Sequence, residues 1–145
     1  MKDGMNTKIV IYEDNIYLRD SLVEFLNSHS NFQVVGAFDN CDHVLQHMEN
    51  LQPKIVLMDI GMNGTNGLEG LKIIRQHFPK VPVMMLTVFE DNDHIFEAIC
   101  RGASGYLLKN TPVEKIPEAI NDLLSGGAPM TPSIARKVFQ LFRNV

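Results

Sequence analysis

The chain has 145 residues, 45% of them hydrophobic and 21% charged, which is enough to bury the core of one globular domain. Its formal net charge of −4 excludes the overall basic surface that nucleic-acid-binding domains carry. No apolar run is long enough to cross a membrane, and MKDGMNTK at the start lacks the apolar core of a signal peptide. The two cysteines, Cys41 and Cys100, are expected to be reduced thiols, buried or half-buried, of a cytoplasmic protein.

Short apolar runs alternate along the chain with stretches whose apolar residues recur at helical spacing. After a leader at 1–7, strands are predicted at 8–12, 32–37, 55–58, 81–86 and 104–108. Helices are predicted at 16–28, 44–51, 68–77, 95–101 and 111–125. In the last of these, Thr111 is predicted as the N-cap and Pro112 as the first helical residue, with Pro117 tolerated near the first turn.

Strict alternation of five strands with five helices predicts an α/β fold with a doubly wound, five-stranded parallel sheet. Each crossover has room for a helix and is expected to be right-handed. The flavodoxin-like strand order 2-1-3-4-5 is predicted, followed by a C-terminal linker helix. In that order the first and third strands are neighbours, and ligands of such sheets bind outside the carboxyl ends of the strands.

Polar residues with complementary chemistry follow four of the predicted strands. Glu13 and Asp14 follow the first strand, Asp59 the third, Thr87 the fourth and Lys109 the fifth. Three carboxylates at one rim repel one another, and a hard divalent cation such as Mg²⁺ relieves that repulsion. A lysine and a hydroxyl beside them offer donors to a further anion. The set predicts a Mg²⁺ site that receives a phosphoryl group on a carboxylate.

Each of these residues also has an ordinary explanation when it is taken alone. An acidic pair is often a solvated turn, an aspartate after a strand often caps that turn, and a lysine is often on the surface. The joint placement at successive strand ends favours the site. His43 and His47 lie four residues apart on one helix, but no third ligand is evident, so both are predicted to be exposed.

Taken together, the acidic pair and the motifs VLMDIGM, LTV and GYLLK resemble the receiver domain of bacterial two-component response regulators. The resemblance runs from about residue 8 to residue 127. The segment GGAPMTPSIARKV that follows resembles the NarL/FixJ (LuxR-type) subgroup, in which a linker leads to a helix-turn-helix. It implies a leader at 1–7, a receiver domain at 8–127 and a linker with a C-terminal helix at 128–145.

The resemblance also implies roles for single residues. Asp59 would accept phosphate from a phosphohistidine on a sensor histidine kinase or phosphotransfer protein. Asp14 would bind Mg²⁺ directly, Glu13 would act through the metal's water molecules, and the carbonyl of Gly61 would complete the protein ligands. The receiver would thus be modified without being a turnover enzyme.

Two further residues would bind the phosphoryl oxygens, namely Lys109 and the hydroxyl of Thr87. Tyr106 matches the aromatic residue whose orientation reports on Thr87. Because these groups can follow the new charge only by moving the fourth and fifth strands, the switch surface is expected to be helix four, strand five and helix five.

Two positions near the site depart from the family pattern, and two others influence the rate of dephosphorylation in the family. Asn63 stands where the family usually has proline, and Val88 where it often has alanine. The side chains two residues beyond the nucleophile and the threonine influence how fast phosphate is lost, and here they are Gly61 and Phe89. Slow self-dephosphorylation is expected, because Gly61 cannot position a water molecule and Phe89 is bulky.

The C-terminal stripe of Ile134, Val138, Leu141 and Val145, widened by Phe139 and Phe142, leaves two alternatives open. The helix folds onto its own domain, or it presents a surface for a homodimer or another partner. The subgroup implies transcription regulation through a DNA-binding domain outside these residues, and the chain is expected to be part of a longer protein.

Three other functions remain as alternatives. A stand-alone or pseudo-receiver would act only as a protein-interaction module, although the acidic set is complete. A Mg²⁺-dependent aspartyl phosphatase of the haloacid dehalogenase type needs a second acid where Gly61 stands. An FMN-binding flavodoxin needs a Ser/Thr-rich phosphate loop after the first strand, and this chain lacks one.

Overall fold

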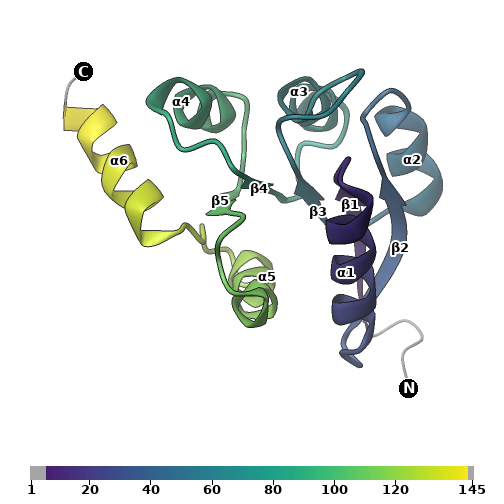
Figure 1. Cartoon of the computed structure of the whole chain (residues 1–145). Helices are drawn as coiled ribbons and strands as arrows, with labels where there is room; N and C mark the ends of the chain where they lie inside the picture. The colour runs from purple at the N-terminus through teal and green to yellow at the C-terminus, as the bar shows by residue number, and fades with distance from the viewer. Residues whose placement is uncertain (1–5, 144–145) are drawn as a thin grey trace.

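The computed structural model describes residues 6–143. Five parallel strands form one sheet in the order β2-β1-β3-β4-β5, which confirms the predicted topology (Figure 1). The strands are β1 Thr7–Tyr12, β2 Phe32–Phe38, β3 Ile55–Met58, β4 Val83–Thr87 and β5 Gly105–Leu108. The α-helices are α1 Ile16–Asn27, α2 Val44–Leu51, α3 Gly67–His77, α4 Asn92–Cys100, α5 Ile116–Leu124 and α6 Pro132–Arg143.

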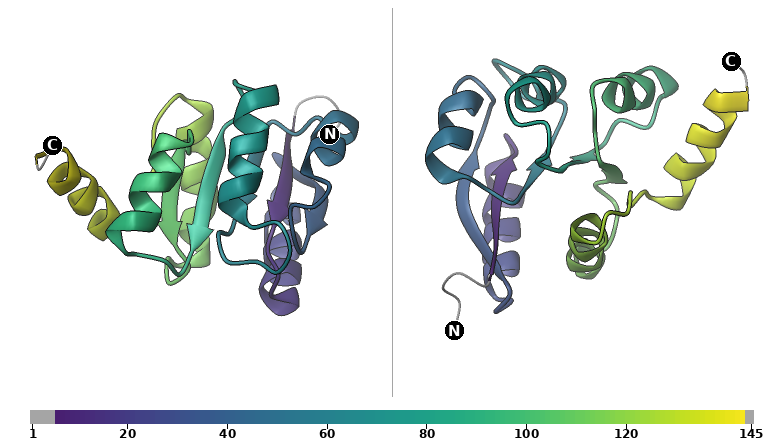
Figure 2. Two further views of the ribbon diagram at one scale, coloured as in Figure 1. Left: turned by 90° about the horizontal axis from the view of Figure 1, so that it is seen from above. Right: turned by 180° about the vertical axis from the view of Figure 1, so that it is seen from behind.

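The sheet is covered on both faces, as a parallel sheet requires. Helices α1 and α5 lie on one face, and α2, α3 and α4 lie on the other (Figures 1 and 2). Successive strand residues point to opposite faces, so Ile9 and Ile11 pack with α1 and α5, whereas Val10 and Tyr12 pack with the three other helices. The strand β3 lies at the centre of the sheet and is buried throughout, which places the residue after Met58 at the middle of the rim.

The start of α5 differs from the prediction. Pro112 has an extended backbone, with ψ of 138°, and a 3₁₀ turn at Val113–Lys115 precedes α5. Thr111 therefore does not cap the helix. Pro117 lies in the first turn of α5, where a missing N–H costs no helical hydrogen bond.

The two cysteines differ in environment. Cys41 is buried against Met58, and burial raises the pKa of its thiol to about 12. Cys100, at the end of α4, is exposed, so the prediction that both thiols are at least half-buried is wrong for Cys100. Both are free thiols.

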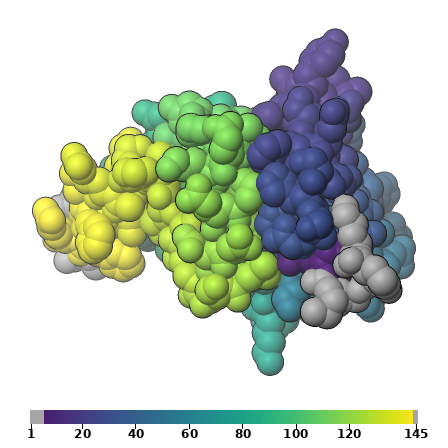
Figure 3. Space-filling view, turned by 90° about the horizontal axis from the view of Figure 1, so that it is seen from below, coloured from purple at the N-terminus to yellow at the C-terminus, as the bar shows by residue number. Residues whose placement is uncertain are grey.

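The helix α6 packs onto its own domain at the β5 end of the sheet, beside α4 (Figures 1 and 2). Ile134 is fully buried, and Val138 and Leu141 pack against the same core cluster, while Val145 lies outside the described residues. Phe139 and Phe142 remain 68% and 70% exposed. In the space-filling view of the α1–α5 face, α6 forms the end of the molecule next to α5 (Figure 3). Within 6–143, no helix is long and apolar enough to span a bilayer.

Candidate functional site

Backbone hydrogen bonds just beyond the strand ends hold the rim of the sheet together. The N–H of Asp59 donates to the carbonyl of Tyr12 at 3.0 Å, and the N–H of Lys109 donates to the carbonyl of Thr87 at 2.9 Å. The ladder β1–β3 and the ladder β4–β5 are thereby each extended by one residue. As a result, the polar residues that follow β1, β3 and β5 converge at one edge with Thr87, the last residue of β4, as predicted.

One lysine links two buried carboxylates at this edge. The Nζ of Lys109 lies 2.8 Å from Oε1 of Glu13 and 2.8 Å from Oδ2 of Asp59. Glu13 is only 1% exposed and Asp59 only 4%, so neither carboxylate has much access to water. The other oxygen of Asp59, Oδ1, accepts a hydrogen bond from the N–H of Ile60 at 2.7 Å. The Asp59 carboxylate is therefore fixed in orientation from both sides.

Burial and pairing act in opposite directions on these groups. Desolvation raises the pKa of Glu13, and its hydrogen bonds to Lys109 and to the N–H of Asn15 only partly offset that rise. Desolvation lowers the pKa of Lys109, but the hydrogen bonds to Asp59 and Glu13 outweigh it, and the net pKa is raised. Lys109 therefore stays a cation beside the carboxyl groups of Glu13 and Asp59.

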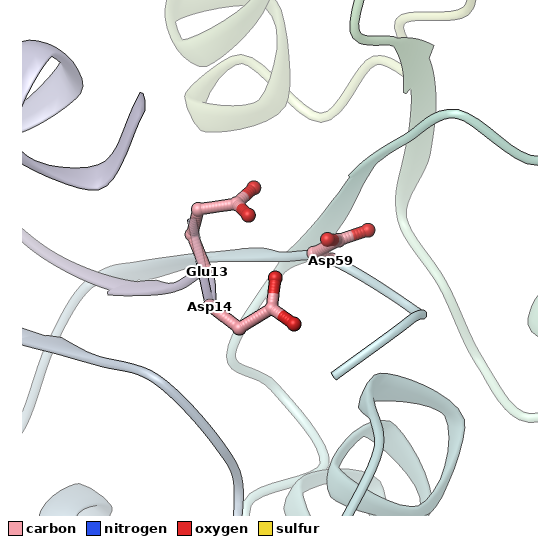
Figure 4. A group of neighbouring side chains, drawn as sticks. All are labelled: Glu13, Asp14 and Asp59. Atoms are coloured by element: carbon pink, nitrogen blue, oxygen red, sulfur yellow. The ribbon is translucent and has the colours of Figure 1, made fainter. Parts of the chain in front are cut away.

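Three carboxylates of the rim form an oxygen-rich cluster (Figure 4). One oxygen of each of Glu13, Asp14 and Asp59 lies within 4.8 Å of the others. Asp14 is exposed, which leaves the cluster open to solvent on one side. Such hard oxygen donors fit Mg²⁺, which keeps several water molecules and takes one or two protein carboxylates. These residues could therefore hold the ion, while Gly61 lies two residues after Asp59 in the following loop.

Thr87 and Tyr106 meet at the loop that leaves β4. The hydroxyl oxygen of Thr87 accepts from the N–H of Phe89 at 3.4 Å, and the hydroxyl of Tyr106 donates to the carbonyl of Phe89 at 2.7 Å. Both side chains are buried, and burial raises the pKa of the Tyr106 hydroxyl. The two residues are thus connected through one loop residue.

Sequence reasoning missed residues that support the site. A Cβ atom on Gly67 would lie 1.8 Å from the carbonyl oxygen of Asp59, so α3 can start there only with glycine. Asn15 caps α1 through its side chain, and its own N–H donates to Glu13 at 3.0 Å. Arg19 donates to the carbonyl of Glu13 at 2.8 Å. An asparagine directly before the apolar residues of a helix was the available signal for the cap.

The two histidines of α2 have different environments. His43 is exposed, as predicted. His47 is half-buried: its ring stacks on Phe38 at 3.5 Å, and its Nδ1 is 2.9 Å from the hydroxyl of Tyr12. The prediction that both are exposed is therefore wrong for His47, which packs in the layer between β1, β2 and α2.

The comparisons with known proteins agree with this geometry. Residues 9–121 match the response regulator receiver domain. The transcriptional regulatory protein LnrK of Bacillus subtilis (strain 168) is 37% identical over 131 residues, covering 90% of this chain and 60% of LnrK. The transcriptional regulatory protein DegU of Brevibacillus brevis is 29% identical over 138 residues, covering 95% of this chain and 58% of DegU. The chain thus spans about three-fifths of the length of these relatives.

Solved structures agree as well. A DNA-binding response regulator of the LuxR family from Staphylococcus aureus is 30% identical with a TM-score of 0.75, covering 80% of this chain and 97% of that one. A LuxR-family response regulator from Aurantimonas sp. SI85-9A1 has a TM-score of 0.86 at 24% identity, covering 93% and 96%, and shows the shared fold. With its acidic pocket at the rim, the chain belongs to the response regulator receiver domain family, whose members are signalling domains and not turnover enzymes.

Proposed function

We propose that Asp59 accepts a phosphoryl group from a sensor histidine kinase or phosphotransfer protein in a Mg²⁺-dependent reaction. The observation that carries this proposal is the Asp59 carboxylate itself. It is buried, held at 2.8 Å by Lys109, and grouped with Glu13 and Asp14 in an oxygen cluster that fits Mg²⁺. A carboxylate in this position is oriented for attack, has one cation beside it in Lys109, and has an oxygen cluster that would hold a second.

In the proposed step, one oxygen of Asp59 forms a bond to phosphorus as the bond from phosphorus to the donor histidine nitrogen breaks. That nitrogen keeps the electron pair and takes up a proton, and Asp59 becomes an acyl phosphate. Asp14, Asp59 and the carbonyl of Gly61 would hold Mg²⁺, with Glu13 acting through water, and the ion would supply positive charge to the phosphoryl oxygens.

Two donors complete the proposed phosphoryl site. Lys109 already contacts Asp59 and would pair with a phosphoryl oxygen, and the buried hydroxyl of Thr87 would donate to another. Thr87 and Tyr106 share the residue Phe89, which supports a role for Tyr106 in reading the position of Thr87. The surface formed by α4, β5 and α5 would change as these groups move.

The wider role is proposed from the relatives. LnrK and DegU are transcriptional regulatory proteins, and the Staphylococcus aureus relative is a DNA-binding response regulator. We propose that the full protein is a cytoplasmic transcription regulator that binds DNA through a helix-turn-helix domain outside these residues. Phosphorylation of Asp59 would control it, in part by favouring a homodimer. The residues described here would themselves bind no nucleic acid.

Intact mass spectrometry after incubation with acetyl phosphate and Mg²⁺ tests the proposal. The wild-type chain should gain one phosphoryl group, and Asp59→Asn should gain none. Glu24→Gln removes an exposed carboxylate in the second half of α1, which runs away from the rim, and should gain as much as the wild type. Chelation of Mg²⁺ or Asp14→Asn should slow the gain. No gain in the wild type would favour the alternative of a pseudo-receiver that acts only through protein interactions. An equal gain in Asp59→Asn would show that Asp59 is not the acceptor.

A further inference from the structure

The loop between β4 and α4 is held by hydrogen bonds from three different parts of the chain. The N–H of Phe89 donates to Thr87, the hydroxyl of Tyr106 donates to the carbonyl of Phe89, and Nζ of Lys137 donates to the carbonyl of Glu90 at 2.5 Å. The first two partners belong to the receiver rim. The third belongs to α6, far along the sequence. One loop therefore connects the phosphorylation site to the C-terminal helix.

The segment before α6 is tied to the same tyrosine. The N–H of Tyr106 donates to the carbonyl of Pro129 at 2.9 Å, and the N–H of Thr131 donates to the carbonyl of Tyr106 at 3.1 Å. The hydroxyl of Thr131 accepts from the N–H of Leu108 at 2.9 Å. A Cβ on Gly105 would lie 2.8 Å from the carbonyl oxygen of Pro129, so this close approach needs glycine. The segment thus pairs with the outer edge of β5 and sets where α6 begins.

The docking of α6 itself rests on few contacts. Ile134 is its only fully buried side chain among the described residues, and Val138 and Leu141 are half-buried. Lys137 is half-buried and supplies the hydrogen bond to Glu90. A helix of this length is marginal in water without tertiary contacts. Loss of one charge-assisted hydrogen bond therefore has a large effect on how much of the time α6 is docked.

We propose that the hydrogen bond from Lys137 to the carbonyl of Glu90, here called the latch, couples the docking of α6 to the phosphorylation of Asp59. This inference rests on the proposed function. A phosphoryl group on Asp59 would draw the hydroxyl of Thr87 toward its oxygens and take it from the N–H of Phe89. The loop then rearranges, the carbonyl of Glu90 leaves Lys137, and α6 undocks from α4. By linkage, docked α6 opposes phosphorylation to the same degree that phosphorylation opposes docking.

Hydrogen–deuterium exchange of the α6 amides measures the docked fraction directly, because undocked α6 loses its protection. Acetyl phosphate with Mg²⁺ should speed exchange in α6 of the wild type and leave Asp59→Asn unchanged. Lys137→Met keeps the aliphatic stem and should speed exchange without phosphorylation by roughly tenfold, the effect of one lost charge-assisted hydrogen bond. Arg136→Met removes a charge from the preceding residue, which is exposed, and its α6 amides should exchange as fast as those of the wild type.

Intact mass of the same samples separates the two proposals, and exchange of the β3 amides reports whether each variant remains folded. If the wild type gains no phosphoryl group, the proposed function fails and the latch fails with it. If it gains the group but exchange in α6 does not change, only the latch is overturned. Equal exchange in α6 of Lys137→Met and Arg136→Met would also overturn it, because the hydrogen bond to Glu90 would then not hold the helix.

Discussion

Lys109 forms ion pairs with two buried carboxylates of the rim, because its Nζ lies 2.8 Å from both Glu13 and Asp59. We expect Lys109→Met to lower the free energy of unfolding at pH 7 by about 2 kcal/mol, since two buried carboxylates then lose their cation. Urea unfolding with a chelator present measures this loss. Lys80→Met, which removes an exposed lysine elsewhere, should cost less than about 0.5 kcal/mol.

The difference in unfolding free energy between the wild type and Lys109→Met should depend on pH, and the pKa of Lys109 gives the direction. The pKa of Lys109 is raised above its ordinary 10.5 in the folded state. Its stabilisation is therefore fully present below pH 10.5 and is lost as pH rises through the higher folded value. The stability difference between the wild type and Lys109→Met should be constant near neutral pH and shrink in strongly alkaline urea titrations. A difference that stays constant throughout would contradict the pairing.

Phe89 lies against the residue two positions after the proposed phosphoacceptor. A Cβ on Gly61 would be 3.0 Å from the Phe89 ring, so this ring covers the loop beside Asp59. We expect Phe89→Ala to admit water and shorten the lifetime of the phosphorylated protein roughly threefold, or about 0.7 kcal/mol of barrier. Intact mass at successive times after removal of phosphodonor measures the loss. As a control, Val88→Ala changes an exposed neighbour and should leave this lifetime unchanged. If Phe89→Ala also had the wild-type lifetime, the ring would not be what keeps water from the phosphoryl group.

Among the helices and strands, local pattern predicted best where no distant partner competed. The run 55–58 is bounded by Lys54 and Asp59, and β3 has the predicted limits. Thr111 carried an equally clear local signal for a helix cap. Its hydroxyl instead lies 3.3 Å from the hydroxyl of Thr131, which belongs to the segment that pairs with β5. The spacing of apolar residues carries no information on a contact between residues twenty positions apart, and so the predicted start of α5 was wrong.

The junction between β3 and α3 depends on Gly67. Because an added Cβ would overlap the carbonyl of Asp59, we expect Gly67→Ala to cost about 3 kcal/mol, since backbone must shift to accept it. Gly126→Ala is the matched control: its Cβ meets nothing within 4 Å, but its φ of +89° adds about 1 kcal/mol of backbone strain. Thermal and urea unfolding of both variants measure the costs. Equal losses of unfolding free energy in the two variants would mean that the backbone at Asp59 shifts to accept the Cβ at no measurable cost.

For the entire chain, the sequence predicted the sheet order and the convergence of the rim because both follow from topology. Parallel strands that alternate with helices bring their carboxyl ends to one edge, whatever the details of packing. The position of α6 did not follow in this way. An apolar stripe such as Ile134, Val138 and Leu141 looks the same whether it covers its own domain or another protein. Only the tertiary structure shows that Ile134 is buried beside α4.

Residues 128–143 cover the β5 end of the sheet, so removal of the chain from residue 128 onward should weaken the domain. Burial of Ile134 and the half-buried Val138 and Leu141 is lost, and we expect the free energy of unfolding to fall by about 2–4 kcal/mol. Removal also uncovers the outer edge of β5 at Tyr106, and a bare edge with an apolar patch promotes association. Urea unfolding measures the first effect, and sedimentation at increasing protein concentration measures the second.

The exposed aromatic residues of α6 provide the control for this truncation. Phe139→Ser with Phe142→Ser removes surface apolar area but leaves Ile134 in place, so stability should change by less than about 0.5 kcal/mol. If the truncated chain were as stable as the full chain and stayed monomeric, α6 would contribute nothing to the domain that carries it. If only the double variant lost stability, the outer face of α6, and not its packed stripe, would be the face that the domain needs.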